Sequence, residues 1–373
     1  MKFSINRDYL LNNLNNSSRA ISNKPQMPIL TGIKIEAKDD AVIFTTSNQD
    51  ISIKITLDNS ELMNISSKGT VVLPGKYFLE IIKKCDAKEI IITTFEENIV
   101  KILSNKSTFT LNELDKNMFP FINFDDSPSY FYLDGLNLKQ IIKKTAFATS
   151  VSESKMVLTG VNLVSEGNKI SATATDSYRL AKKFLVLDNE VPTSKSIIPS
   201  KSLEELNKII EDVEQLIQVH VSRTKILFKF KNILFQSRLI EGNFPNTNSL
   251  IPSEFIMELT FNKTDLINAV DRSSLFESND LSSIVKMNVL DTGEVVISSN
   301  TNEIGDAKEV VTPINSTKIL NFETAFSSKY FLDALRAFDS NEITIHFTGE
   351  IKPFIITGDY DVNHVQLILP VRA

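Results

Sequence analysis

The run Lys116-Asn117-Met118-Phe119-Pro120 returns as Glu241-Gly242-Asn243-Phe244-Pro245, and its ending stands a third time, in altered form, as Leu369-Pro370. The three prolines, at positions 120, 245 and 370, are 125 residues apart both times. One repeated dipeptide would be weak support, but each copy follows a stretch rich in strand-forming residues. An internal repeat near one third of the 373-residue chain is therefore the first hypothesis about the fold.

Two further series of landmarks support the same period. Pro74-Gly75-Lys76-Tyr77-Phe78-Leu79 is matched by Pro199-Ser200-Lys201-Ser202-Leu203 and by Ser327-Ser328-Lys329-Tyr330-Phe331-Leu332. Three leucines, each opening a short helical pattern, are spaced by 128 residues: Leu10, Leu138 and Leu266. The sequence therefore predicts three copies of a normal domain size, with boundaries at residues 1–125, 126–252 and 253–373.

Each copy is expected to hold two helices and several strands. Apolar residues recur at helical spacing in six segments, residues 7–20, 74–84, 136–150, 199–210, 262–274 and 327–338. Pro74 and Pro199 suit a first helical turn. Strict alternation predicts strands elsewhere, as at residues 51–57, 109–111, 226–230 and 343–347. The predicted fold class is α+β, with two helices on one side of antiparallel sheets in each of three repeated domains.

Composition excludes several classes of protein. With 42% hydrophobic and 23% charged residues, the chain is neither collagen-like nor wholly disordered. Cys85 is the only cysteine, so a disulfide scaffold is excluded. No apolar run approaches the ~18 residues of a membrane helix, and the first residues lack the apolar core of a secretory signal. We expect a cytoplasmic protein without a membrane partner.

Catalytic chemistry is not indicated at any residue. His220 and His346 stand in strand patterns, where a solvent-facing position is the favoured interpretation. Cys85 follows two lysines at a helix end and is expected to be a packing residue. The pair Asp125-Asp126 lies at the first repeat boundary, and adjacent carboxylates on a strand point to opposite faces. No metal-ligand spacing, phosphate loop or dinucleotide motif is present, so we expect no catalytic residue, metal or cofactor.

Charge is distributed unevenly along the chain. The six helical segments carry a net charge of +7, so the remaining residues carry −13 of the overall −6. Basic helices on an acidic scaffold indicate a surface for a polyanion, although lysines are also common on solvated helix faces. No aromatic residues alternate with the lysines, which disfavours a single-strand stacking platform. A bound nucleic acid would then be duplex, held through its backbone without sequence readout.

Motifs across the whole chain resemble those of bacterial DNA polymerase III beta subunits, the sliding clamps. The opening Met1-Lys2-Phe3 with Arg7, the stretch Lys24-Pro25-Gln26-Met27-Pro28-Ile29-Leu30 and the ending Leu369-Pro370-Val371-Arg372 are similar to that family. The central Ala174-Thr175-Asp176-Ser177-Tyr178-Arg179-Leu180-Ala181 resembles its most recognisable motif. The motifs also stand in the order that the family shows.

The resemblance implies a head-to-tail homodimer that forms a ring, with helices lining the hole and sheets outside. Sequence-independent binding of double-stranded DNA would follow, without enzymatic activity, and the ring would act as a polymerase processivity factor. By resemblance, Lys24 and Lys201 match DNA-contacting positions. Helix charge adds five further candidates: Lys83, Lys84, Lys139, Lys143 and Arg272.

The resemblance also implies a pocket for partner peptides between the second and third copies. The pocket positions that carry over are Leu158, Thr175, Ser177, Tyr178, Arg179, Leu180, Pro245, Leu250, Tyr330, Ile351, Pro353, Leu367, Ile368, Leu369, Pro370, Val371 and Arg372. Such an apolar cleft with a few polar groups suits a short peptide with Gln and Leu or Phe. The chain departs from the family pattern in three places. Ser177-Tyr178 stands in place of a commoner Gly-His pair, Ser249 in place of an Arg of some members, and Ala373 in place of a terminal Leu. These departures bear on which peptides the pocket prefers.

Dimer contacts are expected to pair Phe109 and Leu111 of one copy of the chain with Leu275 and Phe276 of another. Implied partners are the replicative polymerase III alpha subunit, the clamp loader complex and other proteins with a clamp-binding motif. Two alternatives stay open: a hydrolase or transferase built on repeated α+β domains, and a repetitive scaffold unrelated to DNA. The lack of clustered His, Cys or Gly motifs argues against the enzyme. The uneven charge, +7 on the helices and −13 elsewhere, argues against the scaffold.

Overall fold

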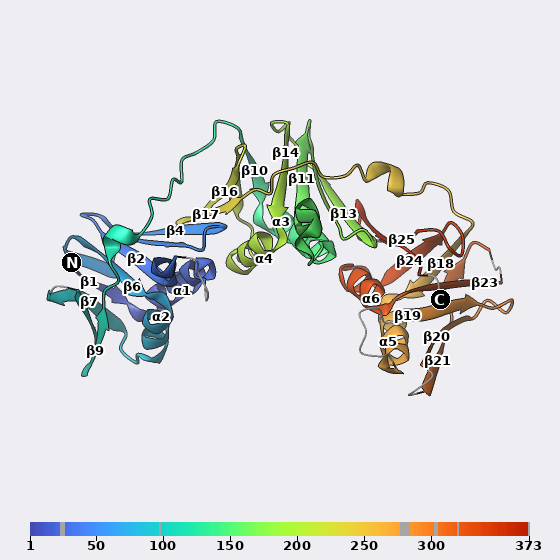
Figure 1. The fold of residues 1–373 in the computed structure, drawn as a ribbon, viewed down its shortest axis with the longest axis horizontal. Coiled ribbons are helices and arrows are strands. Elements are labelled where there is room, and N and C mark those ends of the chain that lie inside the picture. The colour runs from blue at the N-terminus through green and yellow to red at the C-terminus, as the bar shows by residue number, and fades with distance from the viewer. Residues whose placement is uncertain (23–26, 97, 277–283, 302–304, 319–320, 372–373) are drawn as a thin grey trace. The chain divides into compact units, whose positions relative to one another are not determined.

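The computed structural model describes residues 1–373 except 23–26, 97, 277–283, 302–304, 319–320 and 372–373 (Figure 1). The residues form two compact units, Met1–Leu136 with Lys201–Leu239, and Asn137–Ser200 with Ile240–Ala373. The middle repeat contributes to both units: its first strand, helix α4 from Lys201 onward and its last three strands belong to unit 1, and the residues between, 137–200, belong to unit 2.

The prediction of two helices in each repeat is confirmed. The helices are α1 (Arg7–Ser17), α2 (Gly75–Lys84), α3 (Gly135–Thr145), α4 (Ser200–Ile209), α5 (Lys263–Ser273) and α6 (Ser328–Arg336). Leu10, Leu138 and Leu266 are all buried, as their common spacing requires. Pro74 and Pro199, however, end the strands that precede α2 and α4 and do not lie in the first helical turn. Pro74 has a ψ of 107°, which is extended backbone.

A capping residue recurs at the start of the first helix of each repeat. The side chains of Asn6, Asp134 and Asn262, spaced by 128 residues, accept hydrogen bonds from backbone N–H groups two residues further on at 3.0, 2.9 and 2.9 Å. These bonds satisfy donors that have no partner inside the helix. The repeat therefore fixes where each of these helices begins.

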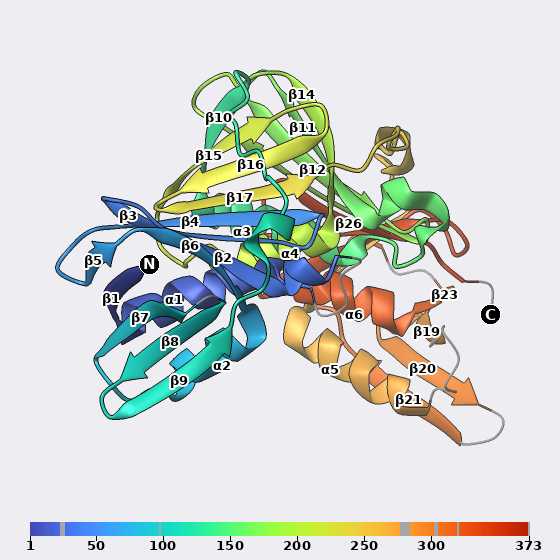
Figure 2. The same cartoon turned by 60° about the vertical axis from the view of Figure 1, so that its left-hand side comes forward.

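Unit 1 is built on two antiparallel sheets. The five-stranded sheet has the order β5 (Met63–Ser67), β1 (Lys2–Asn6), β7 (Glu89–Glu96), β8 (Ile99–Ser104), β9 (Ser107–Asn112). The eight-stranded sheet has the order β10 (Tyr130–Asp134), β15 (Leu216–Val221), β16 (Lys225–Phe230), β17 (Ile233–Arg238), β4 (Ile51–Asp58), β3 (Ala41–Ser47), β2 (Gly32–Ala37), β6 (Gly69–Pro74). Figure 2 shows β16, β17, β4 and β3 as neighbours in this sheet.

Unit 2 repeats this plan. Its nine-stranded sheet has the order β14 (Ser194–Pro199), β11 (Gly160–Glu166), β12 (Lys169–Thr175), β13 (Arg179–Val186), β26 (His364–Ile368), β25 (Phe354–Gly358), β24 (Glu342–Phe347), β18 (Met257–Asn262), β22 (Asn315–Ser316). Its four-stranded sheet has the order β21 (Gly305–Val311), β20 (Val295–Thr301), β19 (Ile284–Val289), β23 (Phe322–Ser327).

Two strand pairs join neighbouring repeats into continuous sheets. In unit 1, β4 of the first repeat pairs with β17 of the middle repeat, with Ile53 opposite Phe235. In unit 2, β13 of the middle repeat pairs with β26 of the third, with Leu180 opposite Leu367. In both cases the last strand of a run of three consecutive strands meets the last strand of another such run, β2-β3-β4 with β15-β16-β17 and β11-β12-β13 with β24-β25-β26, so each junction has the same construction.

Aromatic side chains fill the core of the third repeat. Phe326 and Phe331 stack with ring centroids 4.4 Å apart, and Phe354 lies against both rings at 5.6 and 6.2 Å. All three side chains are fully buried, where such pairs add to the hydrophobic stabilisation. Helices α5 and α6 pack against each other in this repeat, as Figure 1 shows.

Candidate functional site

The turn between β12 and β13 is organised by its own side chains. Asp176 Oδ1 accepts hydrogen bonds from the backbone N–H groups of Tyr178 and Arg179, at 2.9 and 3.0 Å. Thr175 Oγ1 donates to the carbonyl of Arg179 and accepts from Ser177 N. Ser177 has a φ of +81°, in the left-handed region that L-residues seldom adopt. The side chains of Thr175 and Asp176 thus hold the turn, and Tyr178 at its tip is 62% exposed.

Arg179 is buried and fully engaged. Its guanidinium bonds the carboxylates of Asp176 and Asp333 at 3.0 and 2.7 Å, and it donates to the carbonyl of Phe147 at 2.7 Å. It also lies 4.4 Å from the centre of the Tyr330 ring. With these partners, Arg179 serves to position the turn and the tyrosine. Its partner Asp333 could not be recognised from the sequence, because only the folded chain brings α6 to this turn.

An apolar floor lies next to this turn. Leu180 and Leu367 are opposite each other across β13 and β26, and they pack with Ile355 and the partly buried Leu369. Leu369 N donates to the carbonyl of Tyr178 at 2.9 Å, which ties the end of β26 to the turn. The rings of Tyr178 and Tyr330 stack at 6.4 Å. The structure thus brings two tyrosines and an aliphatic surface together in unit 2.

The other residues predicted for the pocket lie in several places. Leu250 and Pro353 line a cleft of about 560 Å³ together with Ser249, Pro252, Ser253, Glu254, Phe255, Ile256, Thr348 and Lys352. Leu158 packs in a core cluster with Ile197 and Phe244. The remaining positions are Pro245 and Ile351, which are exposed, Pro370 and Val371, which are half-buried, and Ile368, which is fully buried. Arg372 lies outside the described residues.

The cationic residues predicted to contact DNA differ in their surroundings. Lys83, Lys84, Lys143, Lys201 and Arg272 are exposed on their helices, and Lys139 is half-buried. Lys83 pairs with Glu80 at 3.0 Å, Lys143 with Asp339 at 3.4 Å, and Arg272 with Glu309 at 2.7 Å. The bond to Glu309 raises the pKa of Arg272. Lys24 lies outside the described residues.

A lysine recurs at the same helical position in all three repeats, but only one of the three was predicted from the sequence to contact DNA. Lys76, Lys201 and Lys329 are exposed, and each is the second residue of the second helix of its repeat. A cation there opposes the helix dipole, at a cost of about 0.3–1 kcal/mol. The lysine spacing identified in the sequence was the signal that could have nominated Lys76 and Lys329 alongside Lys201.

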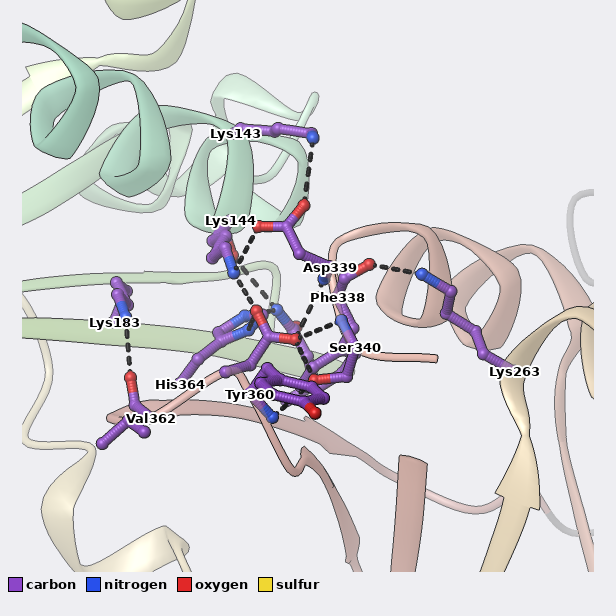
Figure 3. Close-up of polar contacts among 12 residues, drawn as sticks. Lys143, Lys144, Lys183, Lys263, Phe338, Asp339, Ser340, Tyr360, Val362 and His364 are labelled. Atoms are coloured by element: carbon purple, nitrogen blue, oxygen red, sulfur yellow. Dashed lines mark hydrogen bonds and ion pairs between the residues drawn. The ribbon is translucent and has the colours of Figure 1, made fainter. Parts of the chain in front are cut away.

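One lysine of α3 is not available to a ligand in solution. Lys144 is 3% exposed and forms ion pairs with Asp361 and, at 3.0 Å, with Asp339 (Figure 3). Asp361 Oδ2 also accepts hydrogen bonds from the backbone N–H groups of Asp339 and Ser340 and from the Ser340 hydroxyl. The helix charge counted from the sequence therefore overstates the exposed positive charge by this residue.

The ion pair is tied to a neutral histidine. Burial outweighs the nearby carboxylate and lowers the pKa of His364 to about 3. Hydrogen bonds from Lys144 and Ser340 offset the burial of Asp361 and lower its pKa to about 2. Asp361 therefore contributes its stabilisation fully above its ordinary pKa of 3.8 and loses it as the pH falls towards 2.

The predicted dimer contacts occupy exposed or edge positions. Phe109 and Leu111 are half-buried on β9, the edge strand of its sheet. Leu275 is 75% exposed in the turn that follows α5. The side chain of Phe276 lies outside the described part of the structure.

Neither a metal cluster nor a membrane helix is found among the described residues. No group of three or more His, Cys, Asp or Glu side chains in that part of the chain is placed to hold a metal ion. No helix there is long and apolar enough to cross a membrane. Cys85 is buried, which agrees with a packing role.

Known proteins match the chain along its full length. Family models of the DNA polymerase III beta subunit match residues 1–123 (N-terminal domain), 132–246 (central domain) and 248–372 (C-terminal domain). Curated relatives called beta sliding clamp, from Staphylococcus epidermidis and Staphylococcus aureus, are 42% and 40% identical, with full coverage of both chains.

Solved structures agree with these matches. The DNA polymerase sliding clamp from Bacillus subtilis superposes with a TM-score of 0.95 at 38% identity, covering 100% of this chain and 99% of that one. The beta subunit from Streptococcus pyogenes gives 0.94 at 34% identity, with full coverage of both. A sliding clamp from Bartonella birtlesii bound to griselimycin gives 0.91 at 26% identity, also with full coverage of both. The prediction of three repeated clamp-fold domains is thereby confirmed.

We predict that Asp361→Asn destabilises the protein by about 3–5 kcal/mol, because Lys144 keeps its buried charge and loses its main partner. The double variant Lys144→Met with Asp361→Leu removes both charges and is expected to recover much of that loss. The measurement is the shift of the urea unfolding transition. Lys143→Met, which removes an exposed lysine of the same helix, is the control and should shift it by less than about 0.5 kcal/mol. A single variant as stable as the control would contradict this role.

Proposed function

We propose that this chain, which belongs to the DNA polymerase III beta subunit family of sliding clamps, encloses duplex DNA as a head-to-tail dimer. As a sliding clamp it is an accessory subunit that keeps a polymerase on its template. We infer that it has no catalytic site of its own and that it acts in the cytoplasm. We also propose that its three domains meet at residues 125/126 and 252/253.

One observation supports the ring: the first repeat and the third repeat each have an edge strand of the kind that pairs at the junctions between repeats inside the chain. Each internal junction pairs the last strand of one run of three consecutive strands with the last strand of another. Among the described strands, β9 in the first repeat and β21 in the third end the corresponding runs β7-β8-β9 and β19-β20-β21, and each has a neighbour on one side only. We propose that β21 of one copy pairs with β9 of another. Two such contacts would close a ring of two chains.

Exposed edge strands support this pairing on energetic grounds. An unpaired edge presents a row of backbone donors and acceptors that can template association. Pairing the edges would satisfy those groups, and the apolar side chains of Phe109, Leu111, Leu275 and Phe276 are proposed to be buried beside them. The contact would be heterologous, and rotation by half a turn closes it without leaving further edges.

The helices supply the surface proposed to face DNA. With the bounds that the structure gives them, the six helices carry a net charge of +6, and Arg19 follows α1 in a short turn. Lys76, Lys201 and Lys329 hold a cation at the same helical position in all three repeats, against the local dipole. A phosphate backbone would offset that cost. We propose that these lysines, with Lys24, Lys83, Lys84, Lys139, Lys143 and Arg272, attract duplex DNA without reading its sequence.

Retention on DNA would then be topological. A closed ring does not need tight contacts, so the exposed lysines can exchange phosphates as the ring moves. The net charge outside the helices is negative, which discourages DNA from binding there. A loader that opens the ring is required by this geometry, and we propose the clamp loader complex as that partner.

The pocket in unit 2 is proposed to capture peptides of the polymerase alpha subunit and of other clamp-binding proteins. Its proposed members are the seventeen positions transferred from the family, with Tyr178, Tyr330 and Leu369 at the surface that the structure brings together. The exposed tyrosines offer large contact area with little conformational freedom to lose, as is typical of binding hot spots. Leu180 and Leu367 supply an apolar floor for a leucine or phenylalanine side chain.

The ring predicts different retention on closed and open DNA. After loading, the protein should remain on a nicked circle and leave the same DNA when a restriction enzyme linearises it. The measurement is co-elution of labelled protein with DNA by gel filtration. Equal retention on both forms would contradict encirclement.

Replacing Lys76, Lys201 and Lys329 by alanine should weaken direct, unloaded binding to linear duplex DNA. Removing one lysine–phosphate interaction lowers the slope of log affinity against log salt by about 0.9. Alanine at the exposed strand or turn lysines Lys38, Lys169 and Lys195 is the matched control and should leave the slope unchanged. An unchanged slope in the helix variant would refute this surface.

Leu275→Asp is expected to convert dimers to monomers, because it places a charge in the proposed apolar contact. Sedimentation equilibrium measures the result. Leu62→Asp, at a leucine that is also exposed but lies outside the contact, serves as the control and should stay dimeric. A dimeric Leu275 variant would place the interface elsewhere.

Tyr178→Ala should reduce affinity for a fluorescent peptide containing Gln and Leu or Phe by about tenfold or more, the scale of a hot-spot residue. Fluorescence anisotropy measures it. Tyr77→Ala is the matched control, since Tyr77 is 66% exposed on α2 and is not part of the pocket. If both variants bind the peptide as the unmodified protein does, the pocket lies elsewhere.

A further inference from the structure

A second cavity lies in unit 1, under the segment that leads from the first repeat into the middle one. Residues of this segment line an open pocket of about 260 Å³ together with residues of β15, β16 and the turn between them. The cavity is lined by Asn123, Asp125, Asp126, Ser127, Pro128, His220, Ser222, Lys225 and Leu227. It contains none of the residues assigned above to DNA, peptide or dimer contacts.

His220 is held in one orientation at this cavity. The prediction that it faces solvent is wrong, because the side chain is only 3% exposed and packs against the Tyr130 ring at 5.2 Å. Its Nδ1 lies 2.8 Å from the carbonyl oxygen of Ser127. A carbonyl can only accept, so Nδ1 carries the proton. In the neutral ring Nε2 then carries a lone pair, and this buried atom has no hydrogen-bond partner among the described residues.

The carboxylate of Asp126 is held in a complementary way. Lys229 Nζ bonds Asp126 Oδ2 at 2.8 Å, and the other oxygen, Oδ1, lies 3.9 Å from His220 Nε2. The hydrogen bond from Lys229 lowers the pKa of Asp126, so the carboxylate is ionised at neutral pH. His220 Nε2 and Asp126 Oδ1, which both carry a lone pair, therefore face each other. The other ring nitrogen is held by the Ser127 carbonyl, and the other carboxylate oxygen by the Lys229 ammonium group.

The third repeat shows that the fold does not require a free ring nitrogen here. His346 lies 126 residues after His220, on β24, the counterpart of β15. Its Nδ1 is 3.0 Å from Glu258 Oε1 and its Nε2 is 2.8 Å from Thr357 Oγ1. Both nitrogens are thus occupied in the third repeat, whereas the middle repeat leaves Nε2 without a partner among the described residues.

We propose that His220 Nε2 and Asp126 Oδ1 bind a divalent transition-metal ion of the zinc class. Imidazole nitrogen suits such ions, and a ligating histidine usually donates its other N–H to a carbonyl or carboxylate. Ligands at 2.0–2.2 Å around a tetrahedral ion are about 3.3 Å apart, so the half-exposed Asp126 would move by less than about 1 Å. The two protein ligands leave the other coordination positions to water, since no third His, Cys, Asp or Glu side chain is placed to hold a metal ion with them among the described residues.

The ion would clip the connecting segment to the middle repeat. Ser127 Oγ already donates to the carbonyl of Val221, and Lys225 Nζ donates to the carbonyl of Asn123. A metal bond between Asp126 and His220 adds a third tie, and this one can be removed by a chelator. The attachment of the connecting segment to the middle repeat would thereby depend on the concentration of the metal ion.

The test is a titration of the full chain, without added histidines, with Zn²⁺ against a chromophoric zinc indicator. One ion per chain is expected to bind, and Asp126→Asn and His220→Gln should each weaken binding by about tenfold or more. His346→Gln, at the pseudo-equivalent position, is the control and should bind as the unmodified protein does. Co²⁺ in place of Zn²⁺ should give ligand-field absorption that Asp126→Asn alters.

Three results would overturn the proposal: no binding by the unmodified protein, binding that Asp126→Asn does not weaken, or equal weakening by His346→Gln. Asp126 has a side chain that is 53% exposed, so Asp126→Asn is expected to fold even if His220→Gln does not. The Asp126 variant by itself therefore decides the outcome.

Discussion

The architecture depends on antiparallel pairing between strands of neighbouring repeats, each of which ends a run of three consecutive strands. In β4–β17 and in β13–β26 the hydrogen-bonded ladder runs from one repeat into the next, with buried side chains such as Ile53, Phe235, Leu180 and Leu367 along it. Such a junction satisfies two sheet edges at once and buries apolar surface in the same step. The same kind of edge is left with one neighbour only at β9 and at β21, and the proposed dimer would use these two edges by the same rule.

The junction in unit 2 carries additional polar interactions that fix side chains near the candidate pocket. Arg179 ties the β12–β13 turn to α6 through Asp333 and to the chain after α3 through the Phe147 carbonyl. Lys144 of α3 and Asp361, which precedes β26, form a buried ion pair in the same unit (Figure 3). Buried pairs contribute little net stability compared with apolar side chains, but they penalise any arrangement that separates the partners. The Arg179 bonds therefore hold the turn in one geometry, and the Lys144–Asp361 pair fixes α3 against the chain before β26.

The charge distribution and the repeated fold have a common consequence. A protein with a net charge of −6 can attract DNA only if its cations share one surface and its anions another. Repetition supports the proposed DNA surface, because a lysine stands at the same helical position in all three repeats. In that proposal, the carboxylates beside Lys83, Lys143 and Arg272 would weaken the attraction, so that no single phosphate is held for long.

The sequence by itself determined the threefold period, the two helices of each repeat, the α+β class and the family, because these depend on local spacing and motif order. The resemblance of residues 174–181 to a family motif also singled out this segment, but its turn conformation came from the structure. The burial of His220 and Lys144, and the partners Asp333 and Asp361, came only from the tertiary structure. A strand pattern shows which residues share a face but not which face another segment covers, and an ion pair such as Lys144–Asp361 joins residues 217 apart. Packing between distant segments decides these points, and no local pattern records it.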